Sequence, residues 1–243
     1  MRILVISDIH ANYTALEAVL NDAGTVDETW CLGDMVGYGP DPNAVVVQVR
    51  ELTHLTCILG NHDVAVIGRM PFEAFNGDAR RSLAWTEKVL TADNMDFMRM
   101  LPQNAQVRGE VTMAHGSPRD PIWEYVLNTL SARLNFDHFD TPYCFVGHSH
   151  VQAMFQLDEQ NDRATLEVTK ERNAMPLTPR CILNPGSVGQ PRDRDPRAAY
   201  ALYDSKAHTW EARRTEYNII EVQNRIREAG LPEKHAVRLS EGW

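Results

Sequence analysis

The chain of 243 residues is acidic, because 33 Asp and Glu stand against 24 Lys and Arg and give a formal net charge of −9 at pH 7. This charge disfavours non-specific binding to nucleic acid or to an anionic membrane, since both need a broad basic surface. An apolar content of 43% is enough for one sizeable core, so we expect a single domain over residues 1–243.

The cysteines and the short apolar runs favour a cytoplasmic location. The cysteines lie in or beside predicted strands without a CxxC pair, which is typical of reduced core residues. Residues 1–2 lead directly into the first predicted strand and leave no space for a signal peptide, and no apolar run approaches the roughly 18 residues of a membrane span. We expect a soluble, cytoplasmic protein. The cysteines are Cys31, Cys57, Cys144 and Cys181.

Short apolar runs alternate with amphipathic segments over the first 60 residues. Asn12 can cap the first helix and Gly24 can end it. The second helix has Pro42 at its first turn, although residues 45–47, three valines, would also suit a strand. The expected elements are strands at 3–7, 29–33 and 55–59 and helices at 13–23 and 41–52.

Residues 64–109 interrupt this alternation. Helices are expected near 78–90 and 94–101, and Met95 and Met98 stand at helical spacing in the second. A methionine stripe of this kind is more typical of core packing than of a cofactor contact. We predict a helical insertion, or cap, at about 64–109 that shapes access to the strand ends beside it.

Strands and turns dominate the second half of the chain. A loop and a short helix from Thr129 separate two buried strands, and a polar turn at 158–162 predicts a hairpin. We expect the strands after His150 to form a largely antiparallel sheet packed on the first sheet, followed by an amphipathic helix at 218–229. The predicted strands are 111–114, 143–146, 151–157, 164–169, 180–184, 198–204 and 208–214.

Metal-binding residue types follow five of the predicted strands. Ligands of open α/β sheets bind at the carboxyl ends of strands, so these side chains are expected to converge. Asp8 and His10 can hold one ion from two points, and Asp34 has two oxygens that can bridge two ions. Nitrogen and oxygen donors without thiolate favour Mn, Fe, Co, Ni or Zn. The predicted ligands of two metal ions are Asp8, His10, Asp34, Asn61, His115, His148 and His150.

Each motif alone is weakly informative, but the ordered set resembles the calcineurin-like metallophosphoesterases. Their pattern is Asp-x-His, Gly-Asp, Gly-Asn-His-Asp/Glu, His and Gly-His-x-His, and it covers residues 3–150, with a similar β-rich remainder to about 214. The resemblance implies an α+β fold, a four-layer α/β/β/α sandwich. Two packed mixed β-sheets would be flanked by helices, with a dinuclear metal site at the C-terminal ends of the strands.

The resemblance also implies roles for the residues of the site. A water bridging the two ions would be activated as hydroxide for in-line attack on phosphorus. His62 would face the leaving oxygen, oriented by Asp63, and both are predicted to be catalytic. By position, Asp8, His10, Asp34 and His150 would hold the first ion, and Asp34, Asn61, His115 and His148 the second.

One departure from the family pattern concerns the substrate. Phosphoprotein phosphatases and symmetrical diadenosine tetraphosphatases continue Gly-Asp with x-Val-Asp-Arg-Gly, whereas Gly33-Asp34 is followed here by Met-Val-Gly-Tyr-Gly. The arginine is absent, which brings the chain closer to the small bacterial and archaeal phosphodiesterases. Replacement phosphate donors could be Arg119, Arg192 or Arg194, with Arg180 and Arg197 as further candidates, although a solvated loop would also account for each.

The resemblance implies a metal-dependent phosphohydrolase that acts on small phosphodiesters or phosphomonoesters, nucleotides included. One alternative is a catalytically silent metal-binding scaffold for protein interactions; another is a diadenosine-tetraphosphatase-like or phosphoprotein-phosphatase-like activity. A nuclease is disfavoured by the charge. His62 favours an enzyme over a scaffold, since a scaffold need not keep a residue that binds no metal. The sequence leaves the native metal and a homo-oligomer open.

Overall fold

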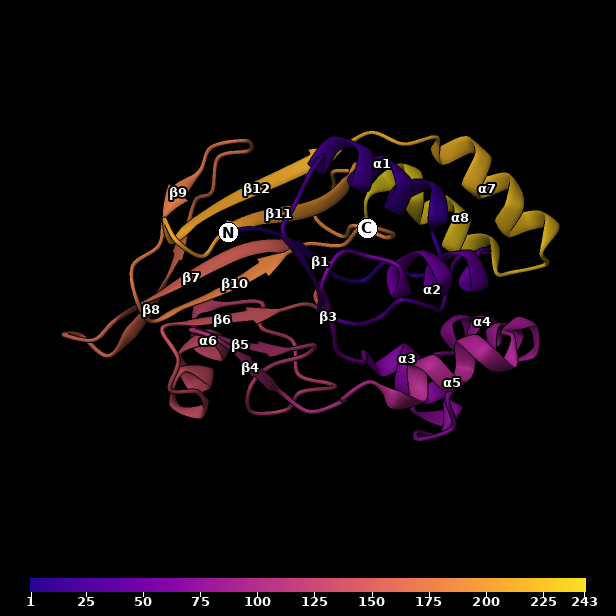
Figure 1. The fold of residues 1–243 in the computed structure, drawn as a ribbon. Helices are drawn as coiled ribbons and strands as arrows, with labels where there is room; N and C mark the ends of the chain where they lie inside the picture. Colours follow the sequence, from indigo (N-terminus) through magenta and orange to yellow (C-terminus); the bar gives the residue numbers. More distant parts are fainter.

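Two six-stranded sheets lie face to face in the computed structural model, which describes residues 1–243 (Figure 1). The first sheet has the order β3 (Leu55–Cys57), β2 (Glu28–Cys31), β1 (Arg2–Ile6), β11 (Ala198–Asp204), β12 (Thr209–Thr215) and β9 (Met175–Pro176). The second has the order β4 (Gln106–Arg108), β5 (Val111–Ala114), β6 (Tyr143–Val146), β10 (Cys181–Pro185), β7 (Gln152–Asp158) and β8 (Arg163–Glu167).

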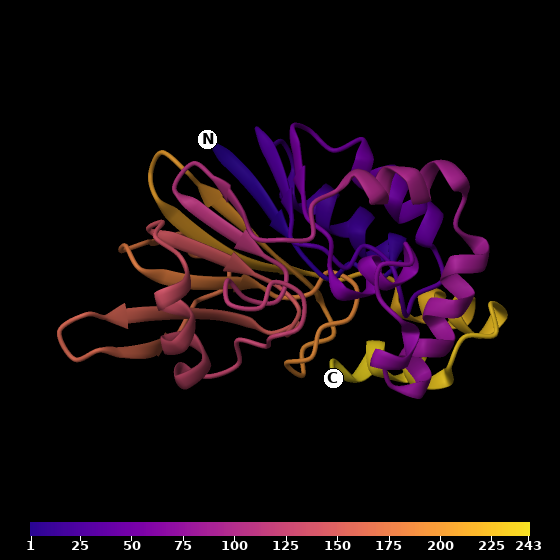
Figure 2. The same cartoon turned by 90° about the horizontal axis from the view of Figure 1, so that it is seen from below.

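Both sheets mix parallel and antiparallel pairs, which confirms the predicted sandwich of two mixed sheets. β1 pairs in parallel with β2 and antiparallel with β11, so that the indigo N-terminal strand lies beside the golden strands in Figure 2. β10 pairs in parallel with β6 and antiparallel with β7, and β7 and β8 form the predicted hairpin.

The expected division of the strands between the sheets is wrong. A separate antiparallel sheet was predicted after His150, but β11 and β12 join the first sheet and β5 and β6 join the second. β1 is buried on both faces, as a central strand must be. Its free edge therefore needs a partner, and β11 supplies one from about 200 residues later.

Three apolar layers follow from the alternation of side chains along the strands. Leu4 and Ile6 of β1 face the helices, whereas Ile3 and Val5 face the second sheet. On the far side of the second sheet, a third cluster includes Phe136. The helix-facing, inter-sheet and outer clusters together account for the four layers of the fold.

Helices cover both outer faces of the sandwich. α1, α7 and α8 lie together over the first sheet, and α6 lies against the second (Figure 1). The side chain of Asn12 accepts from the amide of Ala15 and caps α1 as predicted, and the 42–50 segment is a helix. The helices are α1 (Tyr13–Ala23), α2 (Pro42–Arg50), α3 (Asn61–Val66), α4 (Gly77–Val89), α5 (Ala92–Met100), α6 (Thr129–Asn135), α7 (Ile219–Glu228) and α8 (Glu233–Glu241).

The 64–109 range contains the two expected helices, α4 and α5, and Met98 is fully buried in the helix-facing core. The range also contains two elements that the sequence did not predict. A 3₁₀ turn spans Phe72–Ala74, and β4 at its end is an edge strand of the second sheet.

At the C-terminal end, α7 matches the amphipathic helix predicted at 218–229, and α8 was not predicted. α8 packs against α7 in a small cluster that includes Val222, Ile226 and Leu239. No helix of the protein combines the length and the hydrophobicity needed to span a bilayer.

Candidate metal centre

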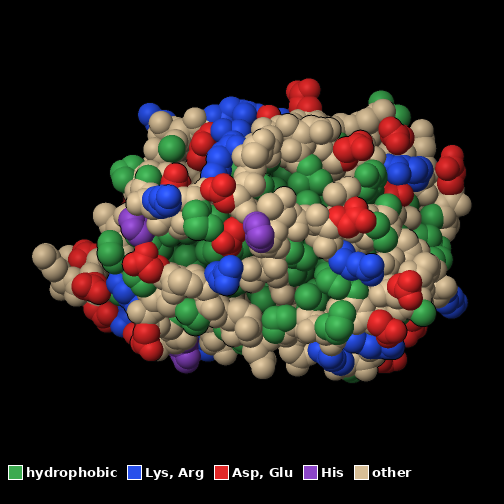
Figure 3. Space-filling view, viewed as in Figure 1, with side chains coloured by type: hydrophobic (Ala, Val, Ile, Leu, Met, Phe, Trp, Pro, Cys, Tyr) green, Lys and Arg blue, Asp and Glu red, His purple; other side chains and the backbone are tan.

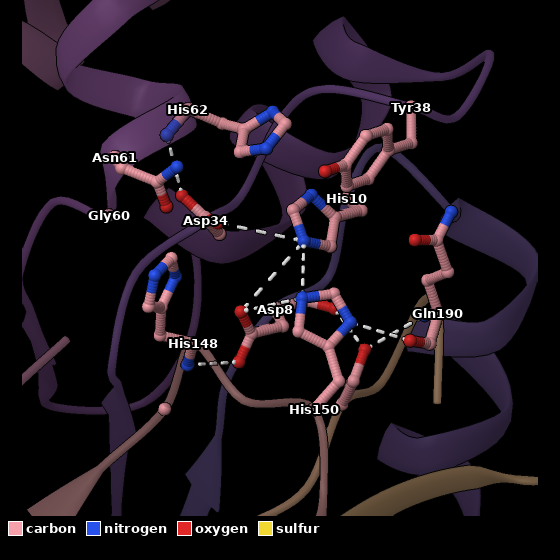
Figure 4. A network of polar contacts seen from close by, with 12 residues as sticks. Asp8, His10, Asp34, Tyr38, Gly60, Asn61, His62, His148, His150 and Gln190 are labelled. Carbon is pink, nitrogen blue, oxygen red and sulfur yellow. Dashed lines mark hydrogen bonds and ion pairs between the residues drawn. The ribbon is translucent and has the colours of Figure 1, made fainter. Parts of the chain in front are cut away.

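The predicted ligands converge at the carboxyl ends of four strands and the start of α3, and Figure 4 labels all of them except His115. The chain turns sharply at these ends, because five ligands have left-handed backbone with φ between 48° and 63°. Such a conformation is costly for residues other than glycine, and its concentration in one place is typical of functional sites. The five are Asp8, His10, Asp34, His148 and His150.

One half of the centre is formed by Asp8, His10 and His150, whose ligand atoms lie within 4.8 Å of one another. The Nε2 atoms of the two histidines are 3.1 Å apart, and His150 Nε2 is 3.3 Å from Asp8 Oδ1. All three side chains are almost completely buried.

Asp34, His115 and His148 form the other half within the same limit. His115 Nε2 lies 3.4 Å from Asp34 Oδ2 and 3.1 Å from Asn61 Oδ1. Asp34 also lies 3.6 Å from His10 Nε2 in the first half. The structure thus brings all seven predicted ligands to one place, with Asp34 between the two halves.

The hydrogen bonds of three histidines show that this place suits cations. The Nδ1 atoms of His10, His115 and His150 lie 3.0, 2.8 and 2.6 Å from backbone carbonyls. A carbonyl only accepts, so each Nδ1 carries a proton; burial keeps the rings of His10 and His150 neutral, and their Nε2 atoms therefore carry lone pairs. The facing Nε2 atoms of His10 and His150 therefore have no proton to share, and a metal ion between them would satisfy both.

Two further buried atoms lack a partner within the protein. Asp8 Oδ1 and His148 Nε2 make no hydrogen bond although both are inaccessible to water. Unpaired buried acceptors are unfavourable. Their position among imidazole nitrogens and carboxylate oxygens fits two divalent first-row ions and excludes a calcium-type site built from oxygen alone.

Burial sets the charge of most of the histidines. It lowers the pKa of His10 and of His148 to about 3, so both are neutral and can bind metal at neutral pH. Burial also opposes charge on His115, but the carboxylate of Asp34 outweighs it and raises that pKa to about 9. Without an ion, a proton on His115 therefore takes over part of the neutralisation of Asp34.

Asp63 is held by the backbone of two loops. Its carboxylate accepts hydrogen bonds from the backbone amides of Gly60, Met35 and Val36 at 3.1 to 3.2 Å, and its orientation of His62 stays a prediction. These bonds join the loop after β2 to the loop after β3. Asp63 thus holds the two loops that carry Asp34 and Asn61 in register, and it is a positioning residue.

His62 is not one of the predicted ligands, but it lies beside them, and one of its ring nitrogens comes within 4.8 Å of ligand atoms of His10 and Asp34. Its Nδ1 is buried and makes no hydrogen bond, and burial lowers its pKa well below the usual value. The ring packs against that of Tyr38 at 4.4 Å between centroids. His62 also lines the cavity above the centre, so it can reach a bound ligand.

A cavity of about 130 Å³ opens over the centre. Its floor includes Asp34, Asn61, His148 and His150, and Arg192 contributes a guanidinium. The aromatic part of the wall was not predicted, because its residues lie outside the motifs at the strand ends that carry the ligands. These wall residues are Tyr38, Phe75, Trp123 and Tyr125.

Of the predicted arginines, Arg192 alone lines this cavity. Its Nη2 lies 3.5 Å from the hydroxyl of Tyr38. Arg119 forms an ion pair with Glu124. Arg194 lies in the same loop as Arg192, and its side chain is exposed to solvent. The two further candidates are also used elsewhere: Arg180 donates to carbonyls near α6, and Arg197 pairs with acidic side chains.

A larger cavity, of about 350 Å³, lies at the opposite ends of the strands, near Met1 and Arg108. Two of the apolar residues around it, Ile3 and Trp30, are at most 3% exposed, whereas Met1 is 38% exposed. It holds none of the predicted ligands, so size does not identify the functional site in this protein.

Comparisons with known proteins agree with this geometry. The model of the calcineurin-like phosphoesterase superfamily domain matches residues 1–208, so that α7 and α8 lie beyond the match. The crystal structure of a metallophosphoesterase from Sphaerobacter thermophilus superposes with a TM-score of 0.91 at 46% identity, covering 100% of this chain and 99% of that one.

Two relatives found by sequence differ in how much of the chain they match. An uncharacterized protein of Methanocaldococcus jannaschii is 36% identical over 243 residues, which are 98% of this chain and 96% of that protein. A symmetrical bis(5′-nucleosyl)-tetraphosphatase of Photorhabdus laumondii is 39% identical over 72 residues, 28% of this chain and 26% of that protein. The second likeness is therefore local.

Proposed function

This chain belongs to the calcineurin-like phosphoesterase superfamily, and we propose that it hydrolyses small phosphoesters, diesters or monoesters, with the help of two divalent metal ions. The observation that carries the proposal is the pair of Nε2 lone pairs of His10 and His150, which face each other at 3.1 Å. A metal ion bound by both nitrogens removes the repulsion between the lone pairs, and the matching arrangement around Asp34 provides the second position.

The proposed roles follow from what each group can donate or accept. When bound, the two ions would supply a water of lowered pKa and neutralise charge on the phosphoryl oxygens. Asp34 would contact both ions. His62, which is not needed as a ligand, would stabilise or protonate the departing oxygen. Arg192 would donate to a non-bridging oxygen, since its guanidinium is the one that lines the cavity.

A nucleotide is our first choice of substrate, because of the local likeness to the symmetrical tetraphosphatase. A nuclease is not favoured, since acidic and basic side chains are interspersed on the face shown in Figure 3 and the net charge is −9. We expect Mn, Fe, Co, Ni or Zn as the metal, and a cytoplasmic location suits the four free buried cysteines.

Metal removal and replacement test the proposal. Chelation should abolish hydrolysis of p-nitrophenyl phosphate and bis(p-nitrophenyl) phosphate, and Mn²⁺, Co²⁺, Ni²⁺ or Zn²⁺ should restore it, because the ions both bind substrate and activate water. The measurement is the initial rate beside the metal content per chain. Full activity in metal-free protein would contradict the proposal. Metal binding without any hydrolysis would favour the scaffold.

A further inference from the structure

Four aromatic rings surround the cavity, and they differ in how far the protein covers them. Tyr38 is only 7% exposed, whereas Tyr125 is 42% exposed and has one face stacked on His148, with ring centroids 4.0 Å apart and an angle of 12° between the rings. Phe75 and Trp123 are partly exposed and pack against each other in a tilted arrangement, with ring centroids 5.1 Å apart and an angle of 51° between the rings. These two rings, which we call the aromatic pair, are therefore available to a ligand.

The aromatic pair lies on the side of His62. Phe75 meets the His62 ring edge to face at 5.1 Å between centroids. The ring centroid of Trp123 lies 6.3 Å from that of His148, which belongs to the cavity floor. Under the proposed function, His62 faces the leaving oxygen. The organic group attached to that oxygen would then extend toward Phe75 and Trp123.

The charges around the cavity favour an anion attached to such a group. The only acidic residue that lines the cavity is Asp34, which faces the metal positions. Arg192 is the positively charged residue of the same lining. An aromatic ring gains from an edge-to-face or offset arrangement with another ring, beyond the area that it buries. A saturated group of the same size gains only from burial.

We propose that this cavity selects phosphoesters whose leaving group carries a planar ring, an aryl or a nucleoside group, and that Phe75 and Trp123 determine the preference. The inference rests on the proposed function. Neither residue is a predicted metal ligand: Phe75 stands directly after the 3₁₀ turn, and Trp123 lies further along the loop that follows His115. Changing them should therefore leave the metal centre intact.

Direct binding of phosphonates, which are not hydrolysed, separates recognition from leaving-group chemistry. We would measure by calorimetry the dissociation constants of phenylphosphonate and cyclohexylphosphonate for the metal-loaded protein. The phenyl compound should bind about two- to tenfold more tightly, the range expected from the extra stabilisation of ring pairs. Phe75→Leu and Trp123→Leu should each reduce this ratio to near one while the metal content stays unchanged.

Phe72→Leu is the matched control. Phe72 begins the 3₁₀ turn that precedes Phe75, and both side chains are partly buried and pack on the helix-facing core, but Phe72 does not line the cavity. This variant should keep the phenyl preference. Circular dichroism of all three variants checks that the fold is retained, and Trp123→Leu decides the question if Phe75→Leu does not fold.

The outcomes distinguish this inference from the proposed function. If wild-type protein binds both phosphonates equally and still hydrolyses phosphoesters, the proposed role of the aromatic pair is wrong and the proposed function stands. A phenyl preference that survives in both leucine variants also overturns the role of the aromatic pair. If the metal-loaded protein binds neither phosphonate and hydrolyses no phosphoester, the proposed function fails, and the inference falls with it.

Discussion

Asp34 is the residue on which both halves of the metal centre depend. Its Oδ2 lies 3.6 Å from the Nε2 of His10 on one side and 3.4 Å from that of His115 on the other. Its Oδ1 also accepts from the backbone amide of His62 at 2.9 Å. The carboxylate thus lies against two histidines and the start of α3, and we expect its charge to attract both of the proposed cations.

Asp34→Asn should therefore lose both ions, whereas His150→Ala and Asn61→Ala should each keep one. The substitution removes the negative charge that both metal positions share, while either of the other two changes affects one position. Elemental analysis of the purified variants measures this directly. Our assignment of the bridge is wrong if Asp34→Asn retains two ions per chain and His150→Ala retains none.

His62→Ala should separate catalysis from metal binding. Loss of a positioned acid or base lowers turnover by about 10²- to 10⁴-fold, and both ions should remain. An ester of p-nitrophenol should lose less activity than an alkyl ester, because nitrophenolate departs without a proton. Steady-state rates for the two substrates give the comparison.

Equal losses for the two substrates would assign His62 to holding the phosphoryl group. Unchanged rates would show that His62 has only a packing role, through the contacts of its ring with those of Tyr38 and His10.

The loop after β2 controls where the His62 ring can lie. Gly37 has φ of +88°, and a Cβ added there would collide with Nδ1 of His62. An L side chain in this conformation is also strained. The glycine therefore both permits the turn and leaves room for the imidazole of His62. Placement of this imidazole thus depends on a loop residue that is not itself a metal ligand.

Gly37→Ala should lower turnover by about 10²-fold, the effect of displacing a catalytic group by about 1 Å, while the metal content stays unchanged. Gly68→Ala is the matched control, since Gly68 has φ of +79° but no atom within 4 Å of an added Cβ. It should lose stability and no activity. Equal activity losses in the two variants would show that backbone strain, and not contact with His62, is responsible.

The elements that could be predicted from the sequence are those with a local signal. Asn12 and Gly24 mark the ends of α1, and the polar motifs after apolar runs mark the strand ends that carry the ligands. The pairing of β1 with β11 was not predictable in this way, because a strand's alternation shows which face is buried and not which strand lies beside it.

The same limit applies to the site. Asp8, His10 and the other ligands were predicted because they occur in motifs, whereas Phe75 and Trp123 reach the cavity from loops through tertiary structure alone. The backbone contacts of Asp63 were also not predictable from the motif, because they depend on α3 beginning at Asn61 and turning this carboxylate toward the backbone of the adjacent loop. Aromatic residues in otherwise polar loops were the only available signal for the cavity wall.

On the scale of the whole molecule, α8 links overall stability to pH. His235 is 2% exposed, its Nε2 lies 3.2 Å from the carbonyl of Asp78, and its Nδ1 makes no hydrogen bond. Burial lowers its pKa to about 4, although Asp78 favours the charged form. The unfolded chain therefore binds a proton on this histidine at a higher pH than the folded chain does.

The contribution of neutral, buried His235 to the free energy of unfolding should be fully present above about pH 6.5, the pKa of an unperturbed histidine. It should decrease as the pH drops toward 4. Urea unfolding at pH 7.5 and pH 5 should show wild-type protein losing about 2 kcal/mol more than His235→Gln. The comparison uses metal-free protein in both cases, so that metal loss does not contribute. Equal losses in wild type and variant would contradict the assignment.

The pairing of β1 with β11 also has a consequence in time. Arg2 lies opposite Asp204, so the central strand of the first sheet lacks one neighbour until about 200 further residues have been made. At synthesis rates of about 5–20 residues per second, this interval lasts roughly 10–40 s. Asp8 and His10 stand at the end of that strand. On the ribosome, the earliest ligands to be made are therefore among the last to be fixed, and metal loading follows translation of β11.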